Sequence, residues 1–182
     1  MKLRWLTILL VLSVSFATSN AQVAIYGKFE TVRFTASNIN PTGTWYYGPG
    51  AGIYYDFLHL GPVALGADLR GNLLSGSQQK FRSALFGLRL SAKPPILPLR
   101  PYIQGSVGVG GPTHSGLDGA GTIYSNKFQY EIIGGLDYTL VPHIEFCAVE
   151  LSYGRMSGVS SGTPAPVATL FTVGTGLVVR FP

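Results

Sequence analysis

Hydrophobic and polar residues alternate with a period of two over most of the chain beyond residue 21. Successive side chains of a β-strand point to opposite faces of its sheet, so this repeat predicts strands with one apolar face. Residues typical of turns separate the alternating stretches. The pattern predicts about eight antiparallel strands and no long helix, over residues 23–34, 44–58, 63–72, 83–92, 102–110, 128–138, 144–153 and 171–181.

The alternation is irregular in two of these strands. Around residues 32–34 the apolar residues slip out of phase, which indicates a β-bulge. In the strand at 144–153, Cys147 and Val149 fall on the apolar face, and Phe146 then falls on the polar face. The register of this strand is therefore the least well defined by the sequence.

The face opposite the aliphatic one carries most of the charge, with both signs present. In the most regular strand, Leu65 and Leu69 alternate with Asp68 and Arg70. Buried charges are costly unless they pair and hydrogen-bond, so we expect these side chains to contact one another inside a closed sheet. Glycines on the same face leave room for them. The predicted inward polar network consists of Lys28, Glu30, Asp56, Asp68, Arg70, Arg89, Glu131, Asp137, Glu150 and Arg180.

The other face is continuously apolar and rich in aromatic residues. A soluble barrel or sandwich has the reverse arrangement, with aliphatic side chains inside and charges in water. A Lys or Arg facing lipid at mid-depth costs about 2–4 kcal/mol, so the uncharged face is predicted to be the lipid-facing one. Aromatic side chains near strand ends form girdles at the headgroups. The predicted girdle consists of Trp45, Tyr47, Tyr55, Phe57, Phe128, Tyr138, Tyr153, Phe171 and Phe181.

The composition agrees with a membrane environment. Charged residues make up 12% of the chain, whereas a soluble domain carries roughly 25%. No segment after the first 21 residues has the roughly 18–20 continuous apolar residues of a membrane helix, so a spanning structure must be a closed β-barrel. The formal charge of +5 comes without a cluster of Lys and Arg, and we expect no nucleic-acid partner.

The first 21 residues have the three parts of a secretory signal peptide. Lys2 and Arg4 precede an apolar run over residues 6–16, and the sequence Ser-Asn-Ala ends at Ala21, just before Gln22. We therefore expect residues 1–21 to be cleaved and residues 22–182 to form one β-barrel domain. Cys147 is the only cysteine, so no intramolecular disulfide is expected.

The predicted connections alternate in length. Short periplasmic turns opposite longer external loops are the plan of outer-membrane barrels. The short connections are residues 58–62 and 140–143, and the long ones are 36–43, 111–127 and 154–166. The connection at 93–101 holds four prolines, which predicts a stiff segment on the periplasmic side. The external loops are where surface contacts would be made.

The signal peptide, the strand count and the final segment Leu177-Val178-Val179-Arg180-Phe181 resemble the small outer-membrane β-barrels of Gram-negative bacteria, the group of the OmpA transmembrane domain and OmpX-like barrels. The resemblance covers residues 22–182. It implies an all-β, closed, up-and-down transmembrane barrel in the outer membrane. It also implies contact with outer-membrane lipid and lipopolysaccharide, insertion by the barrel-assembly machinery, and possible surface ligands at the external loops.

Some barrels of this group modify lipid A, which requires a nucleophile and a base at the lipid interface. His114 and Ser115 are adjacent but lack the His-x-Ser spacing of the deacylase barrels. The glycines at 108–111 precede neither a Gly-Lys-Ser/Thr motif nor a helix, so they do not form a phosphate loop. No His or Cys spacing suits zinc. We therefore expect no enzymatic activity, no catalytic residue, no cofactor and no metal.

Four roles are compatible with the sequence. The first is a structural envelope barrel with a lumen filled by side chains, as expected for about eight strands. The second is a narrow pore for small solutes, with the inward charges along its path. The third is an interfacial lipid-modifying enzyme, and the fourth is a soluble periplasmic barrel that holds an apolar ligand.

The direction of the two faces can be tested with single cysteines. In Leu65→Cys the new thiol should react with a lipid-soluble maleimide, and in Asp68→Cys it should be shielded from that reagent. The wild-type chain supplies the background reaction of Cys147. A protein that stays in solution without detergent, with position 65 shielded and position 68 open to a water-soluble reagent, would contradict the prediction.

Overall fold

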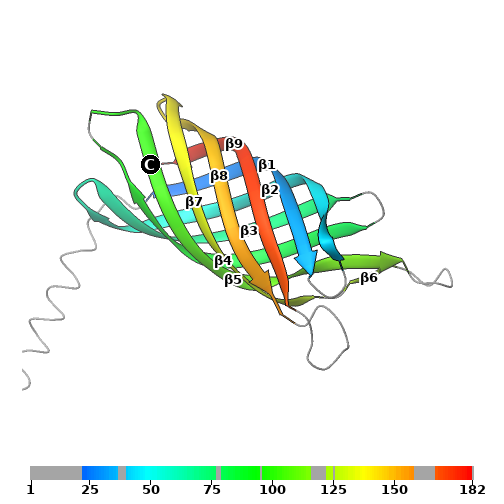
Figure 1. Cartoon of the computed structure of the whole chain (residues 1–182). Coiled ribbons are helices and arrows are strands. Elements are labelled where there is room, and N and C mark those ends of the chain that lie inside the picture. The colour runs from blue at the N-terminus through cyan, green and yellow to red at the C-terminus, as the bar shows by residue number, and fades with distance from the viewer. Residues whose placement is uncertain are drawn as a thin grey trace, which may run out of the picture.

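The computed structural model describes residues 22–36, 40–76, 79–94, 96–115, 122–124, 126–157 and 167–181, and every element in these ranges is a strand. The strands form a tilted barrel (Figure 1). Their bounds are β1 Gln22–Ala36, β2 Asn40–Leu60, β3 Val63–Ser75, β4 Lys80–Ala92, β5 Leu99–Ser115, β6 Thr122–Tyr124, β7 Lys127–Val141, β8 Ile144–Met156 and β9 Ala168–Phe181. No helix among these residues is long and apolar enough to cross a membrane.

Eight of the strands close into an antiparallel up-and-down barrel. The hydrogen-bonded order is β4-β3-β2-β1-β9-β8-β7-β5, and an additional β4–β5 pairing joins the two ends of this series. The first and last strands pair along their whole length, from Val23 opposite Phe181 to Ala36 opposite Ala168. The prediction of a closed barrel of eight strands is confirmed. Closure leaves no unpaired sheet edge.

The two ends of the barrel differ in their connections. Gln22, Phe181 and the two short turns after β2 and β7 lie at one end, here called the turn end. Residues 61–62 and 142–143 form these turns, and Gly61 and His143 adopt the left-handed conformation with φ of 63° and 72°. Strands β1, β3, β5 and β8 end at the opposite end, here called the loop end (Figure 1).

Side chains alternate between lumen and exterior along the barrel strands, except where the register shifts. In β3, Asp68 and Arg70 are buried in the lumen, whereas Leu69 and Leu73 are exposed on the outside. All nine predicted girdle residues face outward and are exposed. Trp45, Tyr47, Phe128, Tyr153 and Phe171 lie toward the loop end, and Tyr55, Phe57, Tyr138 and Phe181 lie toward the turn end.

Both strands expected to be irregular contain a register shift, at positions that differ from the predicted ones. In β1 the shift against β2 falls between Phe34 and Ala36, just after the predicted 32–34. Val32 and Phe34 keep the inward phase of β1 because the lumen itself is apolar at this level. In β8 the register shifts between Cys147 and Glu150, and Ala148 and Val149 both face outward. This bulge places Phe146 outside and Cys147 inside, which reverses the predicted faces of these two residues.

The strands run further than the alternation predicts, so the predicted connections are shorter than expected. The loop predicted at 111–127 is partly strand, because β5 continues to Ser115 and pairs with β6 in a hairpin that extends beyond the barrel (Figure 1). The connection predicted at 93–101 ends earlier, because β5 begins at Leu99 and contains Pro101. Pairing of β5 with β4 stops at Tyr102, so Pro101 has a partner only in β7. The predicted signal peptide lies outside the described residues.

Inward glycines make room for tyrosines that lie across the lumen. A methyl group at Gly135 would lie 2.4 Å from ring carbon Cζ of Tyr102, and one at Gly52 would lie 2.4 Å from the same atom of Tyr26. Both distances are far below van der Waals contact, so any side chain at either position would displace a ring. The neighbouring glycine Gly134 faces outward, and its nearest contact is 3.9 Å away.

We therefore expect Gly135→Ala and Gly134→Ala to have opposite effects. The inward substitution should lower the free energy of unfolding by about 1–3 kcal/mol through overpacking against Tyr102. The outward one should be neutral or slightly stabilising, because glycine weakens a strand. Urea unfolding in detergent micelles, followed by the shift in gel mobility between folded and unfolded barrel, measures both. Equal effects would mean that the lumen has free space around Tyr102.

Candidate functional site

The candidate site is the lumen of the barrel, which holds the charged residues of the strands. All ten residues of the predicted inward network are buried there. Arg100 and Glu145 join them, so the described residues contribute five buried cations and seven buried carboxylates. These groups form a central cluster, a second cluster near the turn end, and a less charged layer toward the loop end.

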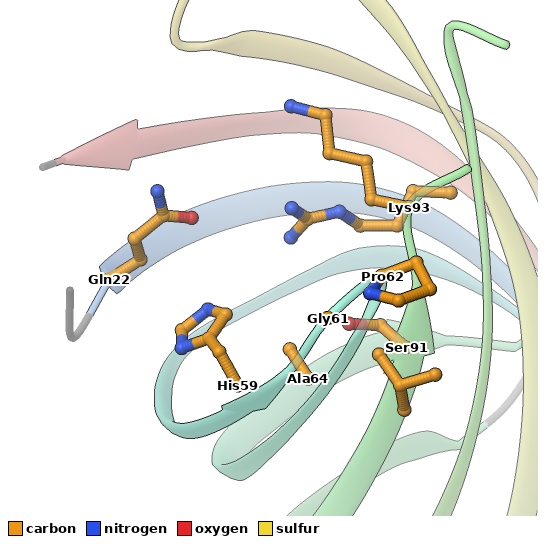
Figure 2. A pocket seen from close by; sticks show the side chains of 9 residues that line it. Gln22, His59, Gly61, Pro62, Ala64, Ser91 and Lys93 are labelled. Atoms are coloured by element: carbon orange, nitrogen blue, oxygen red, sulfur yellow. The ribbon is translucent and has the colours of Figure 1, made fainter. Parts of the chain in front are cut away.

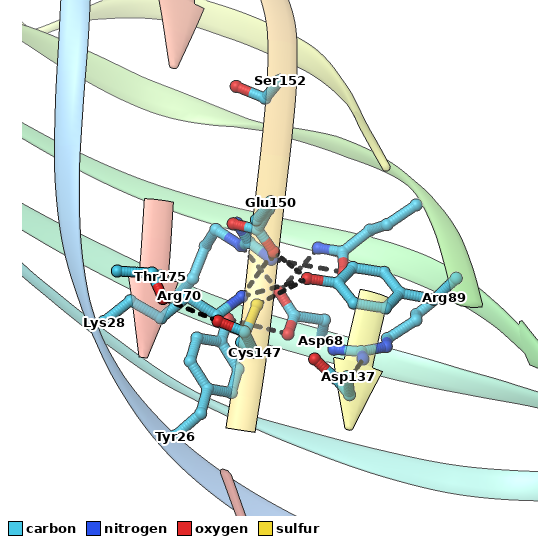
Figure 3. Close-up of polar contacts among 12 residues, drawn as sticks. Tyr26, Lys28, Asp68, Arg70, Arg89, Asp137, Cys147, Glu150, Ser152 and Thr175 are labelled. Atoms are coloured by element: carbon cyan, nitrogen blue, oxygen red, sulfur yellow. Dashed lines mark hydrogen bonds and ion pairs between the residues drawn. The ribbon is translucent and has the colours of Figure 1, made fainter. Parts of the chain in front are cut away.

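Glu150 of β8 is the hub of the central cluster (Figure 3). Its carboxylate accepts hydrogen bonds from Lys28 Nζ and from the Tyr102 hydroxyl. Arg70 Nη1 donates to Glu150 Oε1 over 2.9 Å. These partners come from β1, β3 and β5. Strand β3 lies opposite β8 in the barrel, and β1 and β5 are each separated from β8 by one strand. One carboxylate thus links strands that have no backbone hydrogen bonds to its own.

Asp68 extends the central cluster along β3. Its carboxylate accepts hydrogen bonds from Arg70 Nε at 3.1 Å, from Tyr26 Oη at 2.9 Å and from Gln104 Nε2 at 2.7 Å. Arg70 therefore spans two carboxylates with separate nitrogen atoms, a geometry that the planar guanidinium allows. The charges of this cluster are shared among near neighbours in a water-poor space, where such hydrogen bonds are strong.

Arg89 of β4 forms a separate pair at the same depth. Its Nη2 lies 2.6 Å from Asp137 Oδ2. The centre of its guanidinium lies 3.5 Å from the ring centroid of Tyr102 and 4.3 Å from that of Tyr54. The ion pair and the two aromatic faces together compensate for the loss of water around Arg89. Tyr102 therefore connects Arg89 to the Glu150 cluster.

The second cluster closes the turn end of the lumen. Arg180 Nε lies 2.7 Å from Glu145 Oε2, and Arg180 Nη1 lies 3.4 Å from Asp56 Oδ2. Arg100 Nη1 lies 3.5 Å from the same oxygen of Asp56. Two cavities of about 290 and 240 Å³ open beside these groups, and both are lined by Gln22 and Lys93 (Figure 2). The turn end is thus a shallow vestibule with a floor of ion pairs.

The lumen becomes apolar toward the loop end. Ser152 Oγ donates to Glu131 Oε2 over 2.9 Å, and Gln129 also donates to Glu131, so this carboxylate is held by neutral groups. Glu30 forms no ion pair with the described cations. Beyond them lies a buried apolar cluster, called the apolar plug below. It consists of Val32, Phe34, Ala36, Tyr46, Leu74, Phe81, Met156, Ala168 and Leu170.

Several members of the site were missed in the sequence. Arg100 falls within the predicted connection 93–101, and Glu145 is the second residue of the predicted strand 144–153. Tyr102 and Gln104 share the inward phase of their strand, which was the available signal, but uncharged residues were left out of the network. Cys147 could not be found, because the β8 bulge reverses its face. Its thiol sulfur lies 3.7 Å from the Tyr102 hydroxyl oxygen.

Five of the seven buried carboxylates form ion pairs with the described cations, and Glu30 and Glu131 do not. The one cysteine is buried and unpaired. Within the described ranges, no group of three or more His, Cys, Asp or Glu side chains is placed to hold a metal ion. His114 and Ser115 lie on the extended part of β5, opposite Ile123 and Thr122 of β6. What the lumen does physically is cross-link the barrel wall and occupy its interior.

The chain matches no protein-family model and no curated protein sequence. Among solved structures it is similar to Neisserial surface protein A, with 12% identity and a TM-score of 0.66 over 90% of this chain and 100% of that one. Ail, the attachment invasion locus protein of Yersinia pestis, has 13% identity and a TM-score of 0.55 over 90% and 100% of the two chains. The outer membrane enzyme PagL has 12% identity and a TM-score of 0.52 over 85% and 99%. The chain therefore has the fold of the small eight-stranded outer-membrane barrels.

The hub role of Glu150 can be tested against an equally buried glutamate. Glu150→Gln leaves Lys28 and Arg70 without their shared counter-charge and should cost about 3–5 kcal/mol of unfolding free energy. Glu30→Gln removes a carboxylate that pairs with no described cation, so it should cost less than about 1 kcal/mol or stabilise the barrel. Urea unfolding in micelles compares the two. Similar losses for both variants would refute the hub role.

Proposed function

We propose that the protein is a non-enzymatic integral barrel of the outer membrane whose role is structural. It contributes a rigid, closed unit to the envelope and carries connections at its loop end that are available for surface contacts. The observation that supports this most strongly is the sidedness of the wall. The charged clusters are inside, and the outward strand residues are apolar between two aromatic belts.

The exterior favours lipid over water as the surrounding medium. Outward side chains such as Phe29, Leu69, Leu88 and Ile132 are each about half exposed along the middle of their strands. A monomeric soluble protein rarely exposes an apolar patch larger than a few hundred Å². A belt around the whole barrel is far larger than such a patch. Burying the belt in the hydrocarbon core of a bilayer removes the free-energy cost of exposing apolar surface to water.

The lumen favours a closed tube over a pore. A solute would have to pass the ion pairs of the vestibule floor, the Glu150 cluster and then the apolar plug. The plug is sealed by the rings of Phe34, Tyr46 and Phe81, whose centroids lie 5.7–6.5 Å from one another. The vestibule at the turn end is the one observation that favours a narrow pore, because it opens part of the path.

The fold alone leaves enzymatic activity undecided, because PagL is described as an enzyme and Ail as an attachment invasion locus protein. The buried ion pairs of this chain favour the non-enzymatic role, since their charges compensate one another and do not point to the lipid interface. Surface contacts would be carried by the loop end. Ail has also been solved with a heparin analogue, and its fold is therefore compatible with ligand binding.

If the lumen is closed, the protein should conduct no ions across a membrane. The wild-type protein, reconstituted in planar bilayers, should give no stepwise current, and liposomes that contain it should retain sucrose. Gel mobility before and after boiling verifies that the inserted protein is folded. Reproducible single-channel steps from folded wild-type protein would overturn this role and support the narrow pore.

A further inference from the structure

The outward face of the strands carries charge of one sign and at one end only. Four charged strand residues share the outward phase of their strands, and all are basic: Arg33 of β1, Lys80 and Arg82 of β4, and Arg155 of β8. All four lie in the few residues next to the loop end. Every acidic residue of the described ranges is buried in the lumen. The loop-end rim is therefore cationic on its outside.

Two of these residues face each other across one strand. Arg33 is opposite Phe171 of β9, and Phe171 is opposite Tyr153 of β8, two residues before Arg155. With a strand spacing of about 4.8 Å and a rise of about 3.4 Å per residue, their Cα atoms are about 12 Å apart. Strand β9 carries no acidic residue. Two long guanidinium side chains therefore border the same strip of β9, called the Arg33–Arg155 strip below.

The Arg33–Arg155 strip coincides with the aromatic belt of the loop end. The Arg33 guanidinium lies 5.8 Å from the ring centroid of Trp45. Arg155 is opposite Tyr130 of β7 and follows Tyr153 by two residues, so all three side chains share the outward face. Phe171 is exposed between the two arginines. Aromatic belts lie at headgroup depth, so the two guanidinium groups are at the depth of lipid phosphates.

General solubility does not account for this charge pattern. A surface whose charges serve only solubility carries both positive and negative residues. The segments that join the strands at the loop end, residues 37–39, 76–79, 116–121 and 157–167, contain a single acidic residue, Asp118. An anion at this rim thus meets little like charge, and arginine binds phosphate oxygens in a bidentate way that lysine does not.

We propose that the Arg33–Arg155 strip binds the phosphorylated headgroup of an outer-leaflet glycolipid of the lipid A class. The two guanidinium groups donate hydrogen bonds to phosphate oxygens. The rings of Trp45, Phe171 and Tyr153 pack against the sugar and the first methylene groups. The inference rests on the proposed function in one respect, because it needs the barrel to stand in a leaflet that contains such lipids.

The test uses protein extracted from outer membranes and bisphosphorylated lipid A in maltoside micelles. The predicted cleavage after Ala21 would remove Trp5 and leave Trp45, beside Arg33, as the only tryptophan, and the mass of the extracted protein checks this. Trp45 emission should change as lipid A is added, and native mass spectrometry should count the bound lipid. Dephosphorylated lipid A and inorganic phosphate at the same concentrations should give no change, because the site requires phosphate and lipid together.

The double variant Arg33→Gln/Arg155→Gln should bind lipid A about tenfold more weakly or worse, since it loses two charge-assisted contacts. The matched control Lys80→Gln/Arg82→Gln removes the same charge from β4, on another side of the barrel, and should weaken binding less than about threefold. Mass spectrometry provides the comparison, because Arg33→Gln also alters the surroundings of Trp45.

Three results would overturn the proposal: unchanged binding in the Arg33/Arg155 variant, an equal loss in the β4 control, or saturation by inorganic phosphate alone. If the glutamine variant does not fold, Arg33→Lys/Arg155→Lys keeps the charge and should still bind more weakly than wild type. A conducting wild-type protein would refute the closed-tube role without changing the lipid titration, so the two failures are distinguishable.

Discussion

The structure depends on one constraint, which is that charge removed from water must meet opposite charge or a hydrogen-bond donor. The wall of the barrel has only two faces, and the outward one offers charged groups no partners except at the loop-end rim. The acidic residues of the described strands are therefore gathered in the lumen, where buried Lys and Arg side chains form ion pairs with five of the seven. On the outward face of the wall, where charged groups would lack partners, the residues are therefore apolar and aromatic.

Filling the lumen in this way determines its size and stiffness. The side chains of Tyr26 and Tyr102 reach across the interior, and they fit only because Gly52 and Gly135 lack side chains at the points of contact. Glu150 then joins β8 to three strands with which β8 has no backbone pairing. A barrel cross-linked through its interior resists deformation in a way that backbone pairing alone does not provide.

The similarity to other barrels reflects this constraint more than it reflects particular residues. Identity to the similar structures is 12–13%, although the strands superpose over most of both chains. Alternation, closure and a filled lumen can be met by many combinations of inward side chains. The fold therefore does not specify the role, and what is particular to this chain lies in its clusters and in its cationic rim.

The sequence by itself determined the strand count, the closure and the face of residues such as Asp68 and Leu69, because a period of two assigns every side chain to one of two sides. Only the tertiary structure decided which charges meet, since Lys28 and Glu150 are 122 residues apart and their contact depends on the shear of the barrel. It also decided the positions of Cys147 and Arg100. A single extra residue in β8 reverses a face, and local sequence does not reveal where the neighbouring strand accommodates such a bulge.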